Sequence, residues 1–128
     1  PMHNLLVVED DEDIRNLLVE QLGDKGFHVR QSGDGAAALR RATGQKPDLM
    51  FVDIMMPIMD GIELITELQK DPATSDIPIV LVTAVSTPDI TMQAVRLGVQ
   101  YRLTKPWAPE DLDYVLEQSL GLVSDVKV

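Results

Sequence analysis

The sequence contains no cysteine and few basic residues. Because Cys is absent from all 128 residues, disulfides and thiolate metal sites are excluded, and the composition agrees with a cytoplasmic location. Acidic residues outnumber basic ones by 21 to 11, which gives a net charge of −10. Direct nucleic-acid binding is disfavoured, because phosphate contacts need a basic face. The charge is compatible with binding a cation or a basic protein surface.

Long apolar runs are also missing. No run approaches the ~20 residues that a membrane-spanning helix needs, and no basic and apolar signal segment opens the chain. Apolar residues make up 45% and charged residues 25%, ordinary values for a soluble globular protein. We expect a single domain over residues 1–128, with 1–3 as terminal residues and 122–128 as a tail or the start of a linker.

Short apolar runs alternate along the chain with segments of helical periodicity. The predicted strands are 4–8, 27–31, 49–52, 77–82 and 101–104. The predicted helices are 12–25, 36–44, 62–68, 88–97 and 109–120. This alternation predicts an α/β fold, in which right-handed crossovers cover both faces of a parallel sheet.

Polar residues stand where four of the predicted strands end. Glu9 and Asp10 follow the first strand, Asp53 the third, Thr83 the fourth and Lys105 the fifth. Ligands of open parallel sheets bind beyond the carboxyl ends of the strands, at a switch point in strand order. We therefore expect these side chains to converge.

The convergent set suits a magnesium-dependent phosphoryl acceptor. Three carboxylates in one crevice repel one another, and a hard divalent cation such as Mg²⁺ removes that conflict. No His or Cys belongs to the set, so zinc is disfavoured. Lys105 supplies a positive charge, and the Thr83 hydroxyl can donate to an oxyanion. Asp53, flanked by these groups, is well placed to accept a phosphoryl group.

Four motifs resemble those of the receiver domains of two-component response regulators. They are Val7–Asp11, Val52–Pro57 with Asp60-Gly61, Thr83-Ala84 and Lys105-Pro106, all in order and at matching strand ends. The resemblance implies a flavodoxin-like (βα)5 three-layer sandwich whose five-stranded parallel sheet has the order 2-1-3-4-5. It also implies a phosphoacceptor in a two-component phosphorelay.

The resemblance assigns roles to the acidic residues. Asp53 would accept a phosphoryl group from a phosphohistidine of a sensor histidine kinase or phosphotransfer protein. Asp10 and Asp53 would bind Mg²⁺ directly, with the main-chain carbonyl of Met55 as a third protein ligand. Glu9, where the family usually has Asp, would act on the metal mostly through water.

The remaining roles concern the phosphoryl group and its signal. Thr83 would donate to a phosphoryl oxygen, and Lys105 would pair with the acyl phosphate. The family implies that phosphorylation changes the face formed by the fourth helix, fifth strand and fifth helix. This face would then bind an output domain, another partner or a second copy of the chain, as a homodimer. Such a domain catalyses only its own phosphorylation and dephosphorylation, so we do not expect an enzyme with a metabolic product, a nucleic-acid-binding domain or a membrane protein.

The chain departs from the family pattern at the usual switch residue. Receivers carry Tyr or Phe three residues before the conserved Lys, where this chain has Arg102, with Tyr101 one position earlier. Alternation along a strand predicts that Tyr101 points away from the usual ring position. Burying an unpaired Arg is costly, so we expect an altered coupling, with Arg102 pairing with an acidic group.

Two apolar residues border the expected pocket. Met55 is two residues after Asp53, and Val85 is two after Thr83. Both could hinder the attacking water, which predicts a long-lived phosphoryl group.

Two rival functions use the same fold class. A Mg²⁺-dependent phosphohydrolase with an Asp nucleophile usually has a second Asp two residues later, where this chain has Met55. A flavodoxin-type binding module needs a Ser/Thr/Gly phosphate loop after the first strand, where Glu9, Asp10 and Asp11 would repel a phosphate.

Overall fold

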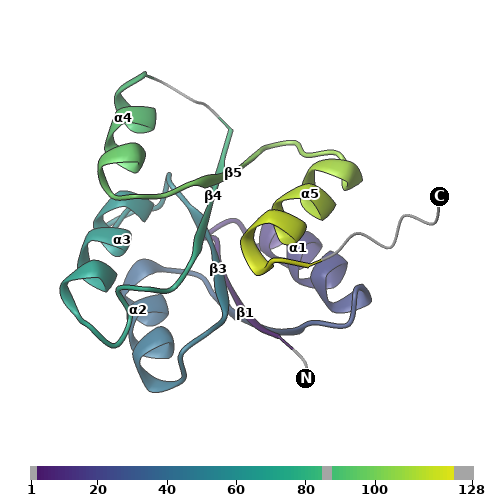
Figure 1. Ribbon diagram of the computed structural model, residues 1–128, viewed down its shortest axis with the longest axis horizontal. Helices are drawn as coiled ribbons and strands as arrows, with labels where there is room; N and C mark the ends of the chain where they lie inside the picture. The colour runs from purple at the N-terminus through teal and green to yellow at the C-terminus, as the bar shows by residue number, and fades with distance from the viewer. Residues whose placement is uncertain (1–2, 85–87, 123–128) are drawn as a thin grey trace.

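A parallel five-stranded sheet with helices on both faces organises the chain (Figure 1). The computed structural model describes residues 3–84 and 88–122. The strands are β1 (Asn4–Val8), β2 (His28–Ser32), β3 (Leu49–Asp53), β4 (Ile79–Thr83) and β5 (Tyr101–Thr104). The helices are α1 (Glu12–Asp24), α2 (Gly35–Gly44), α3 (Gly61–Lys70), α4 (Pro88–Arg96) and α5 (Pro109–Leu120). The strand order is β2-β1-β3-β4-β5, so the predicted flavodoxin-like fold is confirmed.

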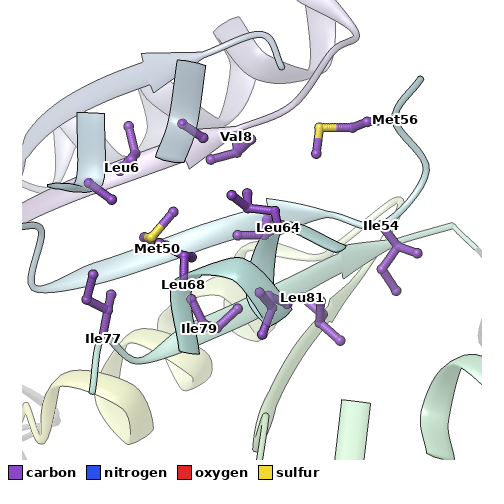
Figure 2. Close-up of a cluster of buried hydrophobic side chains, with 14 of the residues drawn as sticks. Leu6, Val8, Met50, Ile54, Met56, Leu64, Leu68, Ile77, Ile79 and Leu81 are labelled. Carbon is purple, nitrogen blue, oxygen red and sulfur yellow. The ribbon is translucent and has the colours of Figure 1, made fainter. Parts of the chain in front are cut away.

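Two apolar cores lie on opposite faces of the sheet. Helices α2, α3 and α4 lie on one face of the sheet and α1 and α5 on the other (Figure 1). The buried side chains of each group form one core with the strand residues of that face. The first core includes Leu6, Val8, Met50, Leu64 and Leu81 (Figure 2). Successive strand residues alternate between the faces, so β3 and β4 are buried along their whole length. This explains why their sequences read as continuous apolar runs.

Aspartate side chains begin three of the helices. The carboxylates of Asp11, Asp34 and Asp60 accept hydrogen bonds from the main-chain N–H three residues further on, at 3.1, 2.7 and 2.8 Å. These caps satisfy donors that have no partner within the helix. The helix starts therefore fall close to the predicted ones.

Strand boundaries differ from the prediction in β2, β3 and β4. The last residues of β3 and β4, Asp53 and Thr83, lie one position beyond the predicted ends. β2 runs one residue later than expected. β4 begins at Ile79 rather than Ile77, because Ile77 N–H donates to Thr74 O in the preceding loop and Pro78 has no N–H to donate.

The ends of the chain are described only in part. His3 belongs to the fold, since its carbonyl accepts a hydrogen bond from His28 N–H at 3.0 Å. Apart from Leu122, the expected tail at 122–128 lies outside the described residues. No helix in the described part combines the length and apolar character that crossing a bilayer requires.

Gly61 lies against the backbone that follows β3. Its N–H donates to Ile54 O at 2.9 Å, and a Cβ at this position would stand 2.4 Å from Asp53 O. The Asp60-Gly61 pair thus has two local functions, since Asp60 caps α3 and Gly61 lets the helix start close to Asp53.

We predict that Gly61→Ala destabilises the protein by about 3 kcal/mol, because the methyl group meets main-chain atoms that cannot move independently. The matched control is Gly23→Ala in α1, where a Cβ has no neighbour within 4 Å. This control should stabilise by about 0.5–1 kcal/mol. Urea unfolding of both variants measures the difference; equal effects would contradict the close-approach explanation.

Candidate functional site

The carboxyl ends of β1, β3, β4 and β5 bring the predicted site residues to one edge of the sheet. Carboxylate oxygens of Glu9, Asp10 and Asp53 all lie within 4.8 Å of one another. Glu9 and Asp53 are each only 3% exposed, whereas Asp10 is exposed. The side chain of Thr83 is buried at the end of β4.

Lys105 connects two of the acidic side chains. Its Nζ pairs with Glu9 Oε1 and lies 3.2 Å from Asp53 Oδ1. The other oxygen of Glu9 accepts the Asp11 N–H at 3.2 Å. One ammonium thus faces two buried carboxylates, and the local charge is negative even before Asp10 is counted.

Burial and the neighbouring Glu9 raise the pKa of Asp53 to about 7. Burial is the largest cause, followed by the hydrogen bond and the negative charge of Glu9, while Lys105 opposes the shift. For Lys105, burial alone would lower the pKa, but its contacts with Glu9 and Asp53 outweigh burial and raise it. Lys105 therefore stays charged beside a carboxyl that is hard to ionise.

Main-chain hydrogen bonds continue past the strands and hold these residues in register. Ile54 N–H donates to Val82 O at 3.3 Å, and Lys105 N–H donates to Thr83 O at 2.8 Å. Asp53 and Lys105 are thus fixed relative to β4 by backbone rather than by mobile loops.

The sequence model of the response regulator receiver domain matches residues 5–117. The chain belongs to this family.

Curated relatives of this receiver domain are regulators of transcription. It is 35% identical over 109 residues to the alkaline phosphatase synthesis transcriptional regulatory protein PhoP of Bacillus subtilis, covering 85% of this chain and 45% of PhoP. It is 36% identical over 108 residues to PrrA of Mycobacterium tuberculosis, covering 84% of this chain and 46% of PrrA. The receiver spans about half the length of the curated relatives that it matches.

Solved structures have the same fold. Chemotaxis protein CheY4 of Vibrio cholerae superposes with a TM-score of 0.88 at 28% identity, covering 93% of this chain and 99% of CheY4. NtrX of Brucella abortus superposes with a TM-score of 0.85 at 29% identity, covering 94% of this chain but 28% of NtrX. The fold therefore occurs both as nearly a whole chain and as a part of a longer one.

The donor set of this receiver fits Mg²⁺. Glu9, Asp10 and Asp53 offer only oxygen atoms, which hard divalent cations prefer, and no His or Cys belongs to the cluster. A cation at this position would also oppose the mutual repulsion that raises the pKa of Asp53.

The loop after Asp53 carries two exposed apolar residues, Met55 and Ile58. Met55 N–H donates to Asp53 Oδ1 at 3.3 Å, while the residue as a whole is 72% exposed. Ile58 is fully exposed and has a φ of 69°, an unusual conformation for a β-branched residue. Val85, the second residue expected to border the pocket, lies outside the described residues.

Tyr101 and Arg102 differ in their side-chain contacts. Tyr101 packs against the core on the α1 and α5 side, and its hydroxyl donates to Gln118 O at 3.4 Å. Tyr101 also lines a pocket of about 200 Å³ beneath α4, so its predicted orientation, away from the usual ring position, stays a prediction. Arg102 is exposed and lines the same pocket, together with Thr83 and Ala94.

Two side-chain contacts near the site were not predicted. Arg15 Nη1 donates to the main-chain carbonyl of Glu9 at 2.9 Å, and Trp107 Nε1 donates to Gln21 Oε1 at 2.8 Å. Arg15 could have been suspected as the basic residue that follows the acidic strand end by one helical turn. The Trp107 contact joins residues 86 positions apart and has no local signal.

We predict that Asp53→Asn becomes more stabilising as pH rises. A carboxyl whose folded pKa is about 7, above its ordinary 3.8, contributes most stability below pH 3.8 and loses that contribution as pH rises through 7. Asn has no proton to lose. In EDTA, the melting temperature of the variant minus that of wild type should therefore increase between pH 4 and 8.

The control for this titration is Asp76→Asn. Lys46 lowers the pKa of the exposed Asp76, so its variant should show no such increase between pH 5 and 8. If the difference in melting temperature between Asp53→Asn and wild type did not change with pH, the raised pKa of Asp53 would be contradicted.

Proposed function

We propose that this receiver takes a phosphoryl group on Asp53 from the phosphohistidine of a sensor histidine kinase or phosphotransfer protein. One observation carries the proposal: a buried carboxylate at the end of β3 lies 3.2 Å from Lys105 Nζ and within 4.8 Å of two other acidic side chains. The family match over residues 5–117 supports the same chemistry. We also infer that it acts in the cytoplasm.

In the proposed step, a carboxylate oxygen of Asp53 forms the new bond to phosphorus. The P–N bond of the phosphohistidine breaks, and its electron pair stays on the imidazole nitrogen, which takes up a proton. Lys105 pairs with the negative oxygens of the resulting acyl phosphate, and the Thr83 hydroxyl donates to one of them. Positioning and charge neutralisation account for most of the catalysis of such transfers.

Asp10 and Asp53 would hold Mg²⁺ directly, with the Met55 carbonyl as a third protein ligand. The ion would neutralise negative charge on the carboxylates and the incoming phosphoryl group. Glu9 would act through water, since its two oxygens already accept from Lys105 and from Asp11 N–H.

The partner must bring a phosphohistidine to the edge that holds Asp53. An apolar pocket of about 420 Å³ lies beside Lys105, between α1 and the loop after β5, and Leu17, Pro106 and Trp107 line it. Apolar lining next to a reacting group is typical of docking surfaces. We infer that the partner packs against this side during transfer.

A phosphohydrolase is the less favoured function. Such an enzyme usually has an acidic residue two positions after its Asp nucleophile, which acts as the acid or base. Here that position is Met55, whose exposed side chain is apolar. No curated relative reported above is named as a hydrolase.

We predict that incubation with Mg²⁺ and acetyl phosphate adds one phosphoryl group to the protein, and that Asp53→Asn abolishes the addition. Asp48→Asn at the opposite end of β3 is the matched control and should leave it intact. Intact-mass measurement reads both outcomes. Undiminished phosphorylation of Asp53→Asn would overturn the proposal.

Arg102 is proposed to report the phosphoryl group to α4. Beryllofluoride should therefore change amide hydrogen exchange of α4 and β5 less in Arg102→Ala than in wild type, whereas Arg96→Ala, an exposed change on α4, should behave like wild type. An equal beryllofluoride effect in Arg102→Ala and wild type would contradict this role.

Met55 is proposed to slow loss of the phosphoryl group by keeping water from it. Met55→Asn should shorten the half-life of the phosphorylated protein severalfold, because a polar side chain can orient the attacking water. Met92→Asn, a change of another exposed Met that lies on α4, should leave the half-life unchanged. Identical decay of all three proteins would remove Met55 from the account.

A further inference from the structure

The side chain of Arg15 lies across the carboxyl ends of β1 and β2. Its Nη1 donates to Glu9 O at 2.9 Å, and its Nε donates to Gln31 Oε1 at 3.1 Å. Within residues 3–84 and 88–122, no carboxylate lies at ion-pair distance from this guanidinium. Although Arg15 is close to the acidic cluster, its guanidinium therefore donates to two neutral oxygens, one of which is a main-chain carbonyl.

Asp10 depends on that main chain for its orientation. Its carboxylate is exposed and takes part in no hydrogen bond or ion pair with the described residues. The turn that carries it is instead held through its neighbours. Glu9 N–H donates to Ser32 O at 3.1 Å, and Asp11 N–H donates to Glu9 Oε2 at 3.2 Å.

The Glu9 carbonyl is the contact that bears most directly on Asp10. It belongs to the same planar peptide unit as the Asp10 N–H, so fixing its oxygen fixes the direction in which the chain enters the Asp10 Cα. Arg15 makes this contact, and Gln31 anchors the guanidinium from the edge strand.

We propose that Arg15 is a positioning residue of the metal site: it holds the Glu9–Asp10 peptide so that the Asp10 carboxylate faces Asp53. The inference rests on the proposed function, because it assumes that Asp10 and Asp53 bind Mg²⁺. Residues that orient metal ligands without touching the metal typically change metal affinity by about 10- to 100-fold when they are removed.

Removal of the Arg15 side chain should change Mg²⁺ affinity in opposite directions, depending on whether its charge or its positioning of Asp10 matters more. A positive group near a cation site repels the cation, so removal of the charge alone would tighten Mg²⁺ binding. Loss of the Asp10 orientation would weaken it. The sign of the change therefore separates the two roles.

Gly33 gives a second way to move the guanidinium without changing its charge. A Cβ on Gly33 would stand 3.1 Å from Arg15 Nη1, and its φ is not left-handed. Because the neighbour is the far end of a flexible side chain, Gly33→Ala should displace Arg15 at little cost in stability.

The first experiment titrates Mg²⁺ into each protein by isothermal calorimetry, well below its melting temperature. We expect wild type to bind most tightly, Arg15→Lys less tightly and Arg15→Met about tenfold more weakly than wild type. Lys keeps the charge but loses the Nε anchor, whereas Met loses both. The controls Arg40→Lys and Arg40→Met on the exposed side of α2 should not weaken binding.

The second experiment is a double-mutant cycle. Gly33→Ala should weaken Mg²⁺ binding in the wild-type background and have no further effect in Arg15→Met. If wild type binds no Mg²⁺, the proposed function itself fails. If wild type binds Mg²⁺ but Arg15→Met binds as tightly or more tightly, the positioning role is overturned and the proposed function stands.

Discussion

The contact between Lys105 and two buried carboxylates is the interaction on which the site depends. One ammonium faces Glu9 and Asp53, and both of these acidic residues are almost inaccessible to water. Removing Lys105 would leave buried charge without compensation, which is far more costly than losing an exposed pair. One positive charge cannot neutralise two carboxylates and Asp10 as well, so this edge carries an excess of acidic groups. Such an excess is the property that the proposed metal-assisted phosphoryl acceptor needs.

The parallel sheet holds Lys105 and the two buried carboxylates at fixed positions relative to one another. Parallel strands end at a common edge, so site residues from different strands, 22 to 96 positions apart in sequence, become neighbours without any long-range loop to position them. The backbone ladder continues past β3 to Ile54 and past β5 to Lys105. Gly61 allows α3 to start against the Asp53 carbonyl. Asp53 and Lys105 are therefore held by main-chain hydrogen bonds to β4, whereas the side chain of Met55 nearby is exposed.

Local sequence signals predicted most of the fold and the identity of the site residues. Apolar runs and Asp caps are local, so the strands and helix starts could be inferred within two residues, and the strand ends identified Glu9, Asp10, Asp53, Thr83 and Lys105. The contacts between side chains could not be inferred in the same way. Arg15 meets the Glu9 carbonyl, and Trp107 meets Gln21, only because of how far each side chain reaches in the folded chain. The family match identifies the class of domain, whereas the proposed coupling through Arg102 stays a prediction.

The most direct test of the central claim is to locate the phosphoryl group after treatment with Mg²⁺ and acetyl phosphate. Borohydride reduction converts an aspartyl phosphate to homoserine, which peptide mass mapping assigns to a single position. The account predicts that this conversion occurs at position 53 alone and requires Mg²⁺. Conversion at position 10 or 11, or conversion at 53 that persists in EDTA, would contradict it.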